Sequence, residues 1–411
     1  MNFSIAELKK MPIVMTSMSR WDGDFSSASW SLAKSFSQTQ PVIYVDYPFT
    51  ILDFIRERKK PSLIQRKPAL LWGKNPIKPL PEYGEFLYAL TPLLMLPINW
   101  LPKGRLYDFL AKRNDRRLQK SIKKGLTIIN AKDFIFFNSF NPLYLSQIEP
   151  SFGAKVYVYQ SRDNIRALEI YLRKHGAENE IKSIRQANLS LATSKLLQKE
   201  LSELSGKEVA YFPNAADFYL FKKAFEPHFP KPEVLENIPG PIIGYTGNIC
   251  HRINYILLKT ICELHPDKSV VMVGPRNHWG HTDIDLDKID NLYFLGPKKI
   301  EELPNFLAYF DLLVLPFLCN EVTKSIYPLK INEYLASGKP IIATPFSEDI
   351  RSFDGLIVLE EDHLAFARAI NKEIQENNGE KAKKRYDAAS RNTWEERVQL
   401  FWKLLHQTLS V

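Results

Sequence analysis

A run near the C-terminus combines helix breakers and charged side chains in a pattern that suits a phosphate ligand. Residues 320–344 read NEVTKSIYPLKINEYLASGKPIIAT. Pro328 suits the first turn of a helix and Gly338 its end, and the apolar run DLLVLPF (311–317) that precedes them has the composition of a buried strand. A helix that opens at the carboxyl edge of a parallel sheet presents unpaired amides and the positive end of its dipole, which favour a pyrophosphate.

Charged side chains in and near this helix complete the candidate site. Glu333 lies about a turn and a half into the helix, where a carboxylate accepts hydrogen bonds from a ribose diol. In the segment GYTGNICHR (244–252), Gly247 lets the backbone approach a ligand and Arg252 neutralises a diphosphate. The alternatives are an exposed helix carboxylate and a solvated arginine. A third segment, PNAAD (213–217), directly follows a predicted strand.

The elements that must position these residues are short apolar runs that alternate with helix-like segments. Each run is bounded mainly by Gly, Pro or polar residues, which is typical of strands buried on both faces of a parallel sheet. The predicted strands lie within 12–18, 41–47, 133–140, 155–161, 188–194, 208–214, 241–247, 269–275, 291–297, 311–317, 339–345 and 355–361. This βαβ rhythm predicts an α/β fold with two doubly wound, Rossmann-like domains.

Composition restricts the compartment and the partners. The net charge of +9 is uneven, because residues 1–229 carry 34 Lys or Arg against 21 Asp or Glu, whereas residues 230–411 carry 21 against 25. An anionic partner is therefore expected at the first half. Three scattered cysteines indicate no disulfide framework, and the N-terminus lacks the pattern of a secretory signal. We expect a cytoplasmic protein.

The segment 84–124 has two interpretations. An apolar stretch (86–101) that is too short to span a bilayer is followed by nine Lys or Arg against two acids. Leu106, Phe109, Leu110, Leu118 and Ile122 fall roughly on one helical face. The segment is either a peripheral element at an anionic membrane surface or a helix packed on the core with a solvated basic face. We expect no nucleic acid partner, because no binding motif accompanies the charge.

The ordered motifs PNAAD, GYTGNI, VMVGP, LYFLGP, PFLCN and PLKINEYLASGKPIIAT, with a final TWEER helix, resemble the sugar-nucleotide glycosyltransferases of the GT-B fold, in particular the large retaining group called family four or group 1. The resemblance covers about residues 155–405. It implies an acceptor-binding domain at 1–225, a donor-binding domain at 226–390 and a C-terminal helix at 391–411 that packs back on the first domain. The proline-rich stretch 221–241 provides the junction.

The same resemblance implies roles for individual residues. Glu333 matches the carboxylate that binds the donor ribose, Arg252 a basic residue near the diphosphate, and Gly247 the glycine of that loop. The family has a second glutamate eight positions earlier, where this chain has Ser325. The donor sugar is then read by Asn320, Glu321 or Thr323, or the hydroxyl pattern of the donor differs. Lys330 is a candidate for a second positive charge.

Transfer from a nucleotide sugar also needs a way to remove the acceptor proton. Asp163 follows a strand, and Asp22 and Asp24 lie in the first strand-to-helix loop, so these three are the candidate catalytic carboxylates. A retaining enzyme uses the leaving phosphate instead, and the resemblance favours retention. His278, His281, Asp283 and Asp285 superficially offer metal ligands, but they lie in a polar loop, and we expect no metal site.

The overall prediction is a metal-independent glycosyltransferase with no tightly bound cofactor. It moves a sugar from a UDP- or GDP-type donor to a surface-polysaccharide or lipid-linked acceptor, and it is peripheral at the inner face of the cell membrane. Two alternatives remain open, a sugar-nucleotide epimerase of the same double-Rossmann shape and a catalytically inactive binding subunit.

Overall fold

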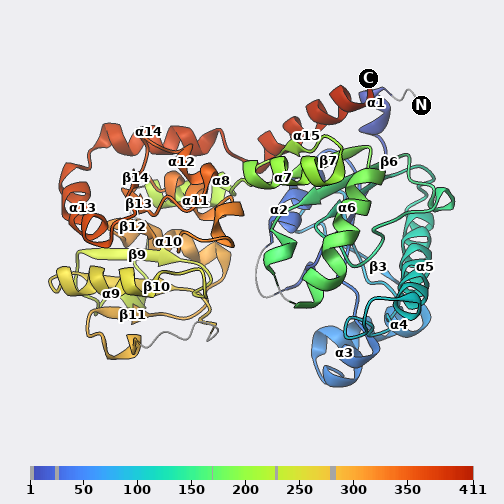
Figure 1. Ribbon diagram of the computed structural model, residues 1–411, viewed down its shortest axis with the longest axis horizontal. Coiled ribbons are helices and arrows are strands. Elements are labelled where there is room, and N and C mark those ends of the chain that lie inside the picture. Colours follow the sequence, from blue (N-terminus) through green and yellow to red (C-terminus); the bar gives the residue numbers. More distant parts are fainter. Residues whose placement is uncertain (1–3, 24–26, 169, 227–229, 278–283, 411) are drawn as a thin grey trace. The chain divides into compact units, whose positions relative to one another are not determined.

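The computed structural model describes residues 4–23, 27–168, 170–226, 230–277 and 284–410 (Figure 1). Two compact units divide the chain. Unit 1 contains the residues up to Pro213 together with those from Arg397 onward, and unit 2 contains Asn214–Glu396. Among the residues so described, no helix has both the length and the apolar character that crossing a membrane requires.

Unit 1 is built on an eight-stranded sheet in the order β3-β4-β2-β1-β5-β6-β7-β8. All neighbours pair in parallel except β3, which is antiparallel to β4 at one edge. The central strands are fully buried because apolar residues continue along both of their faces. The strands are β1 Ile13–Thr16, β2 Val42–Val45, β3 Ile77–Pro79, β4 Leu87–Leu90, β5 Ile135–Ser139, β6 Val156–Ser161, β7 Leu189–Ala192 and β8 Ala210–Tyr211.

Helices of unit 1 connect these strands. The longest, α5, lies on the sheet near Gly125, where an added Cβ would lie 2.4 Å from Leu90 Cδ1, so glycine permits this close approach. The C-terminal helix α15 places Phe401 against Phe36 and Phe137 of unit 1. The helices are α1 Ile5–Leu8, α2 Ala28–Phe36, α3 Ile51–Arg56, α4 Pro61–Trp72, α5 Arg105–Ile128, α6 Ala177–Gln186, α7 Lys195–Ser205 and α15 Trp394–Leu409, with a π-helical turn at Leu172–Gly176.

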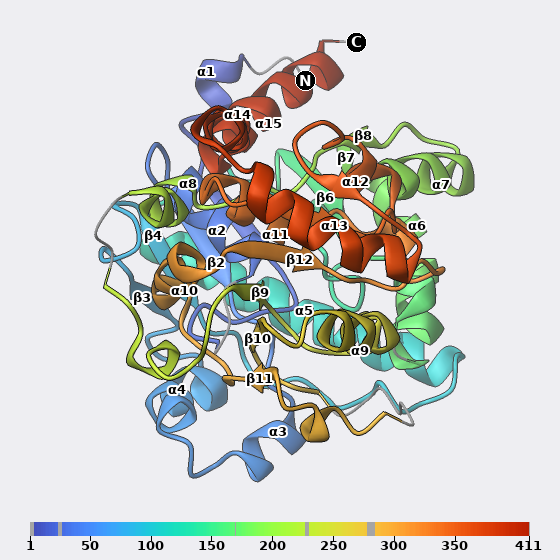
Figure 2. The ribbon, with the colours of Figure 1, turned by 90° about the vertical axis from the view of Figure 1, so that its left-hand side faces the viewer.

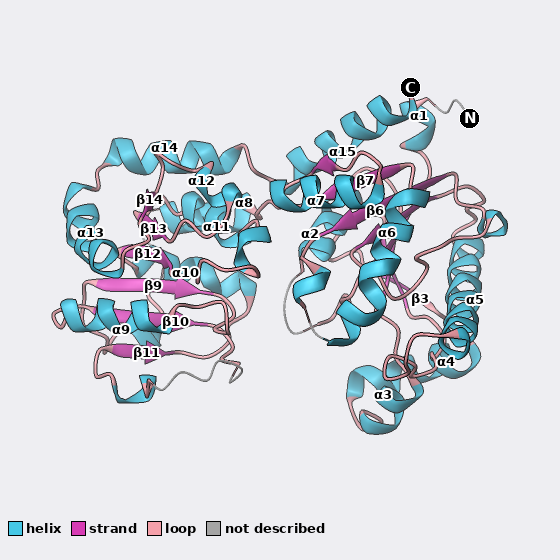
Figure 3. Ribbon diagram, in the orientation of Figure 1, coloured by secondary structure: helices cyan, strands magenta, loops and turns pink. Residues whose placement is uncertain are grey.

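Unit 2 is built on a six-stranded, fully parallel sheet in the order β11-β10-β9-β12-β13-β14, part of which is visible as parallel arrows in Figure 3. Its strands are β9 Ile242–Thr246, β10 Ser269–Val273, β11 Leu292–Phe294, β12 Leu312–Leu315, β13 Ile341–Ala343 and β14 Val358–Leu359. Its helices are α8 Phe218–Phe221, α9 Tyr255–Leu264, α10 Leu303–Tyr309, α11 Leu329–Ala336, α12 Glu348–Arg351, α13 His363–Glu376 and α14 Gly379–Ser390.

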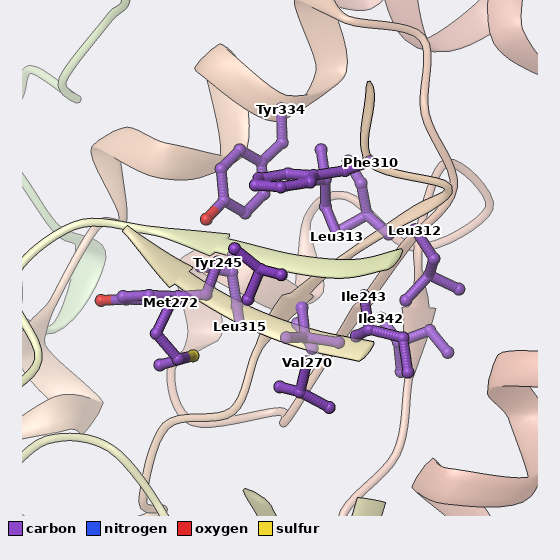
Figure 4. Packing of buried hydrophobic residues seen from close by; sticks show 14 of the residues in the cluster. Ile243, Tyr245, Val270, Met272, Phe310, Leu312, Leu313, Leu315, Tyr334 and Ile342 are labelled. Atoms are coloured by element: carbon purple, nitrogen blue, oxygen red, sulfur yellow. The ribbon is translucent and has the colours of Figure 1, made fainter. Parts of the chain in front are cut away.

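The core of unit 2 places α11 firmly on the sheet. Figure 4 shows the rings of Tyr334 and Phe310 together above the strands, with the Tyr334 hydroxyl directed toward the sheet. That hydroxyl accepts a hydrogen bond of 2.8 Å from the amide of Thr246 at the end of β9. Gly244 provides room for Phe310, because a Cβ there would lie 1.9 Å from the ring. The second half of α11 is therefore held near the carboxyl end of β9.

The predicted α/β class is confirmed, and each of the twelve predicted strand segments contains an observed strand. Strands β3 and β4 were not predicted: β3 lies outside every predicted strand segment, and β4 lies in the stretch 86–101, which was interpreted only as apolar. Its residues Leu87–Leu90 form β4, and Leu94, Met95 and Ile98 are also buried. Phe218, Phe221 and Ala224 belong to the core of unit 2, so the boundary between the units lies before them rather than after residue 225.

The predicted apolar face of α5 lies largely against protein. Leu118 and Ile122 are buried in the core of unit 1, and Leu110 packs beside a smaller buried cluster. Leu106 and Phe109 remain exposed at the start of the helix. The second half of α5 therefore matches the core-packed interpretation with a basic outer face.

Candidate functional site

The topology of unit 2 marks one position at the edge of its sheet. The chain runs from β9 to β10 and β11 on one side, and then returns to β12 on the other side of β9. The connections after β9 and β12 therefore leave in opposite directions and open a crevice, which is where doubly wound sheets bind ligands. The two predicted motifs, 244–252 and 320–344, contain the loops that follow these two strands.

Backbone hydrogen bonds join the two loops. The amide of Asn254 donates to the carbonyl of Pro316 at 2.8 Å, and the amide of Leu318 donates to the carbonyl of Arg252 at the same distance. Ile253 and Phe317 form an antiparallel bridge between these bonds. Side chains on both loops are thus carried by one rigid backbone frame.

Gly247 is required by the geometry of this frame. Its φ of +137° is unfavourable for any residue with a side chain, and an added Cβ would lie 2.7 Å from Cε of Lys330. Its amide donates to Val273 at the end of β10. Gly274 follows that strand, and a Cβ there would lie 1.8 Å from the carbonyl oxygen of Gly247. The glycines let the backbone of the loop and the Lys330 side chain share a narrow space.

Lys330 and Glu333, the second and fifth residues of α11, form an ion pair. Lys330 Nζ lies 3.2 Å from Oε2 of Glu333, and the Glu333 side chain is nearly buried whereas Lys330 is about a quarter exposed. Partial burial of a carboxylate is tolerated because this cation stabilises its charge. The pair, the Gly247 loop and the helix N-terminus together give a site with anion-binding and hydroxyl-binding groups.

Arg252 and Thr323, both predicted to bind the donor, differ in burial and in hydrogen bonding. Arg252 is half-buried, and its Nε contacts Sγ of Cys250 at 3.4 Å. Thr323 is fully buried, and its hydroxyl donates to the carbonyl of Leu318 and accepts from the amide of Asn320 at 3.1 Å. Thr323 therefore closes its own loop. Ser325, at the position of the absent glutamate, is also buried and donates to Val322.

Two further polar residues lie near the start of α11. Asn214, from the PNAAD segment, donates to the carbonyl of Tyr327 at 3.4 Å. Oδ1 of Asn248, next to Gly247, is buried and accepts no hydrogen bond within the described part of the chain. The sequence reasoning did not single out Asn248, although its place in the GYTGNI motif beside Gly247 was a usable signal.

The carboxyl edge of the unit 1 sheet contains the candidate carboxylates. Both oxygens of Asp22 accept from Arg66, at 2.7 and 2.8 Å, and Arg66 Nε donates to Asp46 at 3.2 Å. Asp46 is completely buried and also accepts from Thr91. Burial raises the pKa of the Asp46 carboxyl, against the opposing effect of Arg66. The sequence reasoning found Asp22 but missed Arg66, which binds it, and Asp46, which Arg66 also binds.

Asp163 lies two residues after β6 and is half-buried. Its neighbour Arg162 donates to Ser139 at 3.2 Å and to Gln160 at 3.1 Å. Burial lowers the pKa of Arg162 to about 10, and the nearby charge of Asp163 acts in the opposite direction. Asp163 is thus placed at the carboxyl edge of the sheet beside a cation. Asp24 lies outside the described residues, so its predicted role is not tested.

The predicted metal-ligand cluster is largely outside the described residues, since His278, His281 and Asp283 are not among them. Asp285 pairs with Lys288 at 2.9 Å. Within the described ranges, no three His, Cys, Asp or Glu side chains are grouped in a way that suits a metal ion.

Comparison with known proteins shows what unit 2 is similar to. Residues 240–376 match the family model described as "Glycosyl transferases group 1". The predicted resemblance is confirmed. Over 235 residues the chain is 25% identical to the "Putative teichuronic acid biosynthesis glycosyltransferase TuaH" of Bacillus subtilis (strain 168). That alignment covers 55% of this chain and 59% of the relative, so the chain matches less than two thirds of the relative's length.

Solved structures confirm the GT-B fold over nearly the whole chain. An α,α-trehalose 6-phosphate synthase from Burkholderia multivorans matches with a TM-score of 0.68 and 10% identity, covering 98% of this chain and 99% of that one. Anabaena Alr3699/HepE, solved in complex with UDP, matches with a TM-score of 0.61 and 12% identity, covering 97% and 100%. At these identities the matches establish the fold, a pair of parallel-sheet Rossmann-like domains.

Proposed function

We propose that this protein is a glycosyltransferase that moves a sugar from a nucleoside diphosphate to a surface-polysaccharide or lipid-linked acceptor. The observation that carries the proposal is the meeting of Gly247, Lys330 and Glu333 at the edge between β9 and β12. The group 1 family match of the same unit and the UDP complex of Alr3699/HepE support a nucleotide sugar as the donor, of UDP or GDP type.

In this proposal unit 2 binds the donor. Glu333 accepts hydrogen bonds from the ribose hydroxyls through the carboxylate capacity that Lys330 leaves open. The diphosphate lies at the N-terminus of α11, where Lys330 and Arg252 provide positive charge. These groups stabilise the leaving diphosphate electrostatically, which makes metal-independent chemistry feasible. Oδ1 of Asn248 offers one more acceptor for a donor hydroxyl.

Unit 1 binds the acceptor. During transfer the bond between the anomeric carbon and the phosphate oxygen breaks, and a bond from that carbon to an acceptor oxygen forms. We propose retention of configuration, with the acceptor proton passing to the leaving phosphate. If a carboxylate assists, Asp163 and Asp22 remain the candidates at the carboxyl edge of the unit 1 sheet, and both oxygens of Asp22 accept hydrogen bonds from Arg66.

Calorimetry with UDP and GDP tests the donor site. Glu333→Ala should weaken binding of the preferred nucleotide about 10- to 100-fold, since hydrogen bonds to a charged group contribute about 1.5–3 kcal/mol. The 2′,3′-dideoxy nucleotide lacks both ribose hydroxyls and should bind wild type and variant equally. If Glu333→Ala weakened binding of the ribonucleotide and of its dideoxy analogue equally, Glu333 would not be a ligand of the ribose.

Two assays separate the alternatives. An epimerase would convert its donor with no acceptor present, whereas a transferase needs an acceptor or slow hydrolysis by water. An inactive binding subunit would release no nucleoside diphosphate even at high protein concentration. Ser325 gives this last alternative a physical basis, because a buried serine bonded to Val322 stands where the family has a carboxylate. Ser325→Glu is the matching gain-of-function variant.

A further inference from the structure

The α3–α4 hairpin, defined here as residues 50–73, turns most of its large apolar side chains outward. The side chains of Ile55, Ile64 and Trp72 are 53%, 55% and 63% exposed. Three neighbours on the same two helices, Ile51, Leu52 and Leu71, are also exposed. Figures 1 and 2 both show α3 and α4 side by side at the margin of unit 1. The hairpin thus presents six exposed large apolar side chains on two neighbouring helices.

A separate set of side chains holds the hairpin on unit 1. Phe49, Leu63, Leu70 and Leu94 form a small buried cluster, against which Phe54 packs. Leu63 and Leu70 are seven residues apart on one face of α4, and Ile64 and Leu71 repeat the same spacing on the adjacent face. The outward apolar face is therefore not needed to anchor the hairpin.

Cations surround this apolar face. Arg56, Arg58, Lys59, Lys60, Lys67 and Lys74 are all exposed. The acids of residues 50–74 are Asp53 and Glu57, and both are engaged. Asp53 accepts from the amide and hydroxyl of Thr50 at 2.8 Å, and Glu57 lies 3.3 Å from Lys60. The face combines aliphatic and tryptophan side chains with an excess of positive charge.

We propose that the α3–α4 hairpin docks on an anionic lipid bilayer, with its apolar side chains among the upper acyl chains and its cations at the headgroups. Tryptophan and isoleucine beside several Lys and Arg are the composition of an interfacial membrane element. The alternative occupant, a protein, fits less well, because lysine is depleted at protein interfaces. The hairpin lies outside residues 84–124, which the sequence predicted to be either a membrane-surface element or a core-packed helix with a basic outer face.

The position of the hairpin connects this surface to the acceptor side of the fold. The inward side of α4 carries Arg66, which holds Asp22 and Asp46 at the carboxyl edge of the sheet. One helix therefore faces lipid on one side and the candidate acceptor edge on the other. The docking surface stands without the proposed function, but its purpose, delivery of a lipid-linked acceptor to that edge, rests on it.

Co-sedimentation of the full chain with vesicles tests the docking. Vesicles of phosphatidylglycerol and phosphatidylcholine should bind the wild type more strongly than pure phosphatidylcholine. The double variant Ile64→Ser/Trp72→Ser should lower the partition coefficient by about tenfold or more, since each fully buried apolar side chain contributes at least that much. The matched control, Ile256→Ser/Leu264→Ser on the exposed face of α9, should bind as wild type.

Two double variants that remove cations, one in the hairpin and one in α5, distinguish the two candidate contacts. Arg58→Gln/Lys59→Gln should reduce binding to the anionic vesicles about fivefold per cation. Lys112→Gln/Lys120→Gln removes two exposed cations of α5 and should change binding much less. The opposite order would return the contact to residues 84–124 and overturn the proposal. So would hairpin variants that sediment like wild type, or a wild type that binds no vesicle.

Controls without lipid separate folding and donor binding from docking. Ile64 and Trp72 are exposed, so their variants should keep the thermal unfolding midpoint of the wild type. Their affinity for UDP or GDP in calorimetry should also be unchanged, because the donor site lies in unit 2. Loss of vesicle binding with intact nucleotide affinity supports docking even if the proposed transfer activity is later refuted.

Discussion

Gly247→Ala is expected to disturb the donor site through Lys330, and its effect can be calculated from two features. The φ of +137° costs an L-residue about 1–3 kcal/mol. The new Cβ would lie 2.7 Å from Lys330 Cε, so the lysine must move and its ion pair with Glu333 is lost, at about 1 kcal/mol. Unit 2 should lose about 2–4 kcal/mol of unfolding free energy, measured by denaturant titration.

The same displacement should weaken nucleotide binding. Removing one charged contact to the diphosphate costs about 1.5–3 kcal/mol, so affinity for UDP or GDP should fall about 10- to 100-fold in calorimetry. Gly296→Ala is the matched control, because its φ is also positive, at +70°, but a Cβ there meets open space. It should show the backbone cost without the loss of affinity.

A double-mutant cycle with Lys330→Ala makes the reasoning refutable. When Lys330 is already shortened to alanine, the contact with its Cε is gone, and Gly247→Ala should cost only its backbone term and the tight contact of 3.1 Å with the Tyr245 hydroxyl. A coupling free energy near 1 kcal/mol or more between the two substitutions is expected. Additive effects, or a Gly247→Ala variant that binds nucleotide as well as Gly296→Ala does, would show that Gly247 and Lys330 do not share the space inferred here.

Three predictions concern unit 1. Burial raises the pKa of Glu180 to about 7 from 4.5, so the folded state binds this proton more tightly and stability falls as pH rises through that window. Glu180→Gln should therefore raise the unfolding midpoint at pH 8 by the equivalent of about 3 kcal/mol and have little effect at pH 4, and an equal gain at both would contradict the assignment. Arg66→Ala leaves the buried Asp46 without its cation and should lower the free energy of unfolding by about 3–5 kcal/mol, measured by thermal unfolding. Asp22→Asn should cost clearly less, because the Asp22 side chain is 27% exposed. The reverse order would show that the ion pair of Arg66 with Asp22 contributes more to stability. Phe401→Ala removes a buried ring whose centroid lies 4.9 Å from that of Phe36, and it should lower the free energy of unfolding by about 3–5 kcal/mol. The control Lys403→Ala, at an exposed residue of the same helix, should leave stability unchanged. Equal effects of the two substitutions would argue that α15 does not anchor on this face.

Buried parallel strands were predictable because apolar residues occupy both of their faces. Short runs such as 241–247 therefore stand out between breakers, and each proved to contain a strand. Residues 86–101 misled the same reasoning, since a buried strand and a mostly buried loop follow one another there, with only Thr91 and Pro92 between the two apolar runs. Periodicity cannot separate these from an apolar surface segment, because all three are continuous apolar runs.

At the candidate site, local signals were predictive and distant pairings were not. The breakers around α11 and its spacing identified Lys330 and Glu333, which form a pair three residues apart. Arg66 reaches Asp46 and Asp22 from positions 20 and 44 residues away, and nothing in the local sequence marks that contact. Thr323 was assigned to a ligand from its position, but a threonine three residues after an asparagine is also a loop-closing pattern, and its hydroxyl is used that way.

The backbone frame that joins the loops after β9 and β12 has a consequence for how new specificities arise. Its bonds, from Asn254 to Pro316 and from Leu318 to Arg252, involve only main-chain atoms. The side chains of Cys319 and Glu321 are therefore exchangeable without loss of the scaffold that carries them, provided that Asn320 and Thr323 keep their turn. Mutational drift at these two positions changes the side chains that the frame presents while leaving its architecture intact, so libraries restricted to Cys319 and Glu321 offer a short test of whether the proposed donor can be altered.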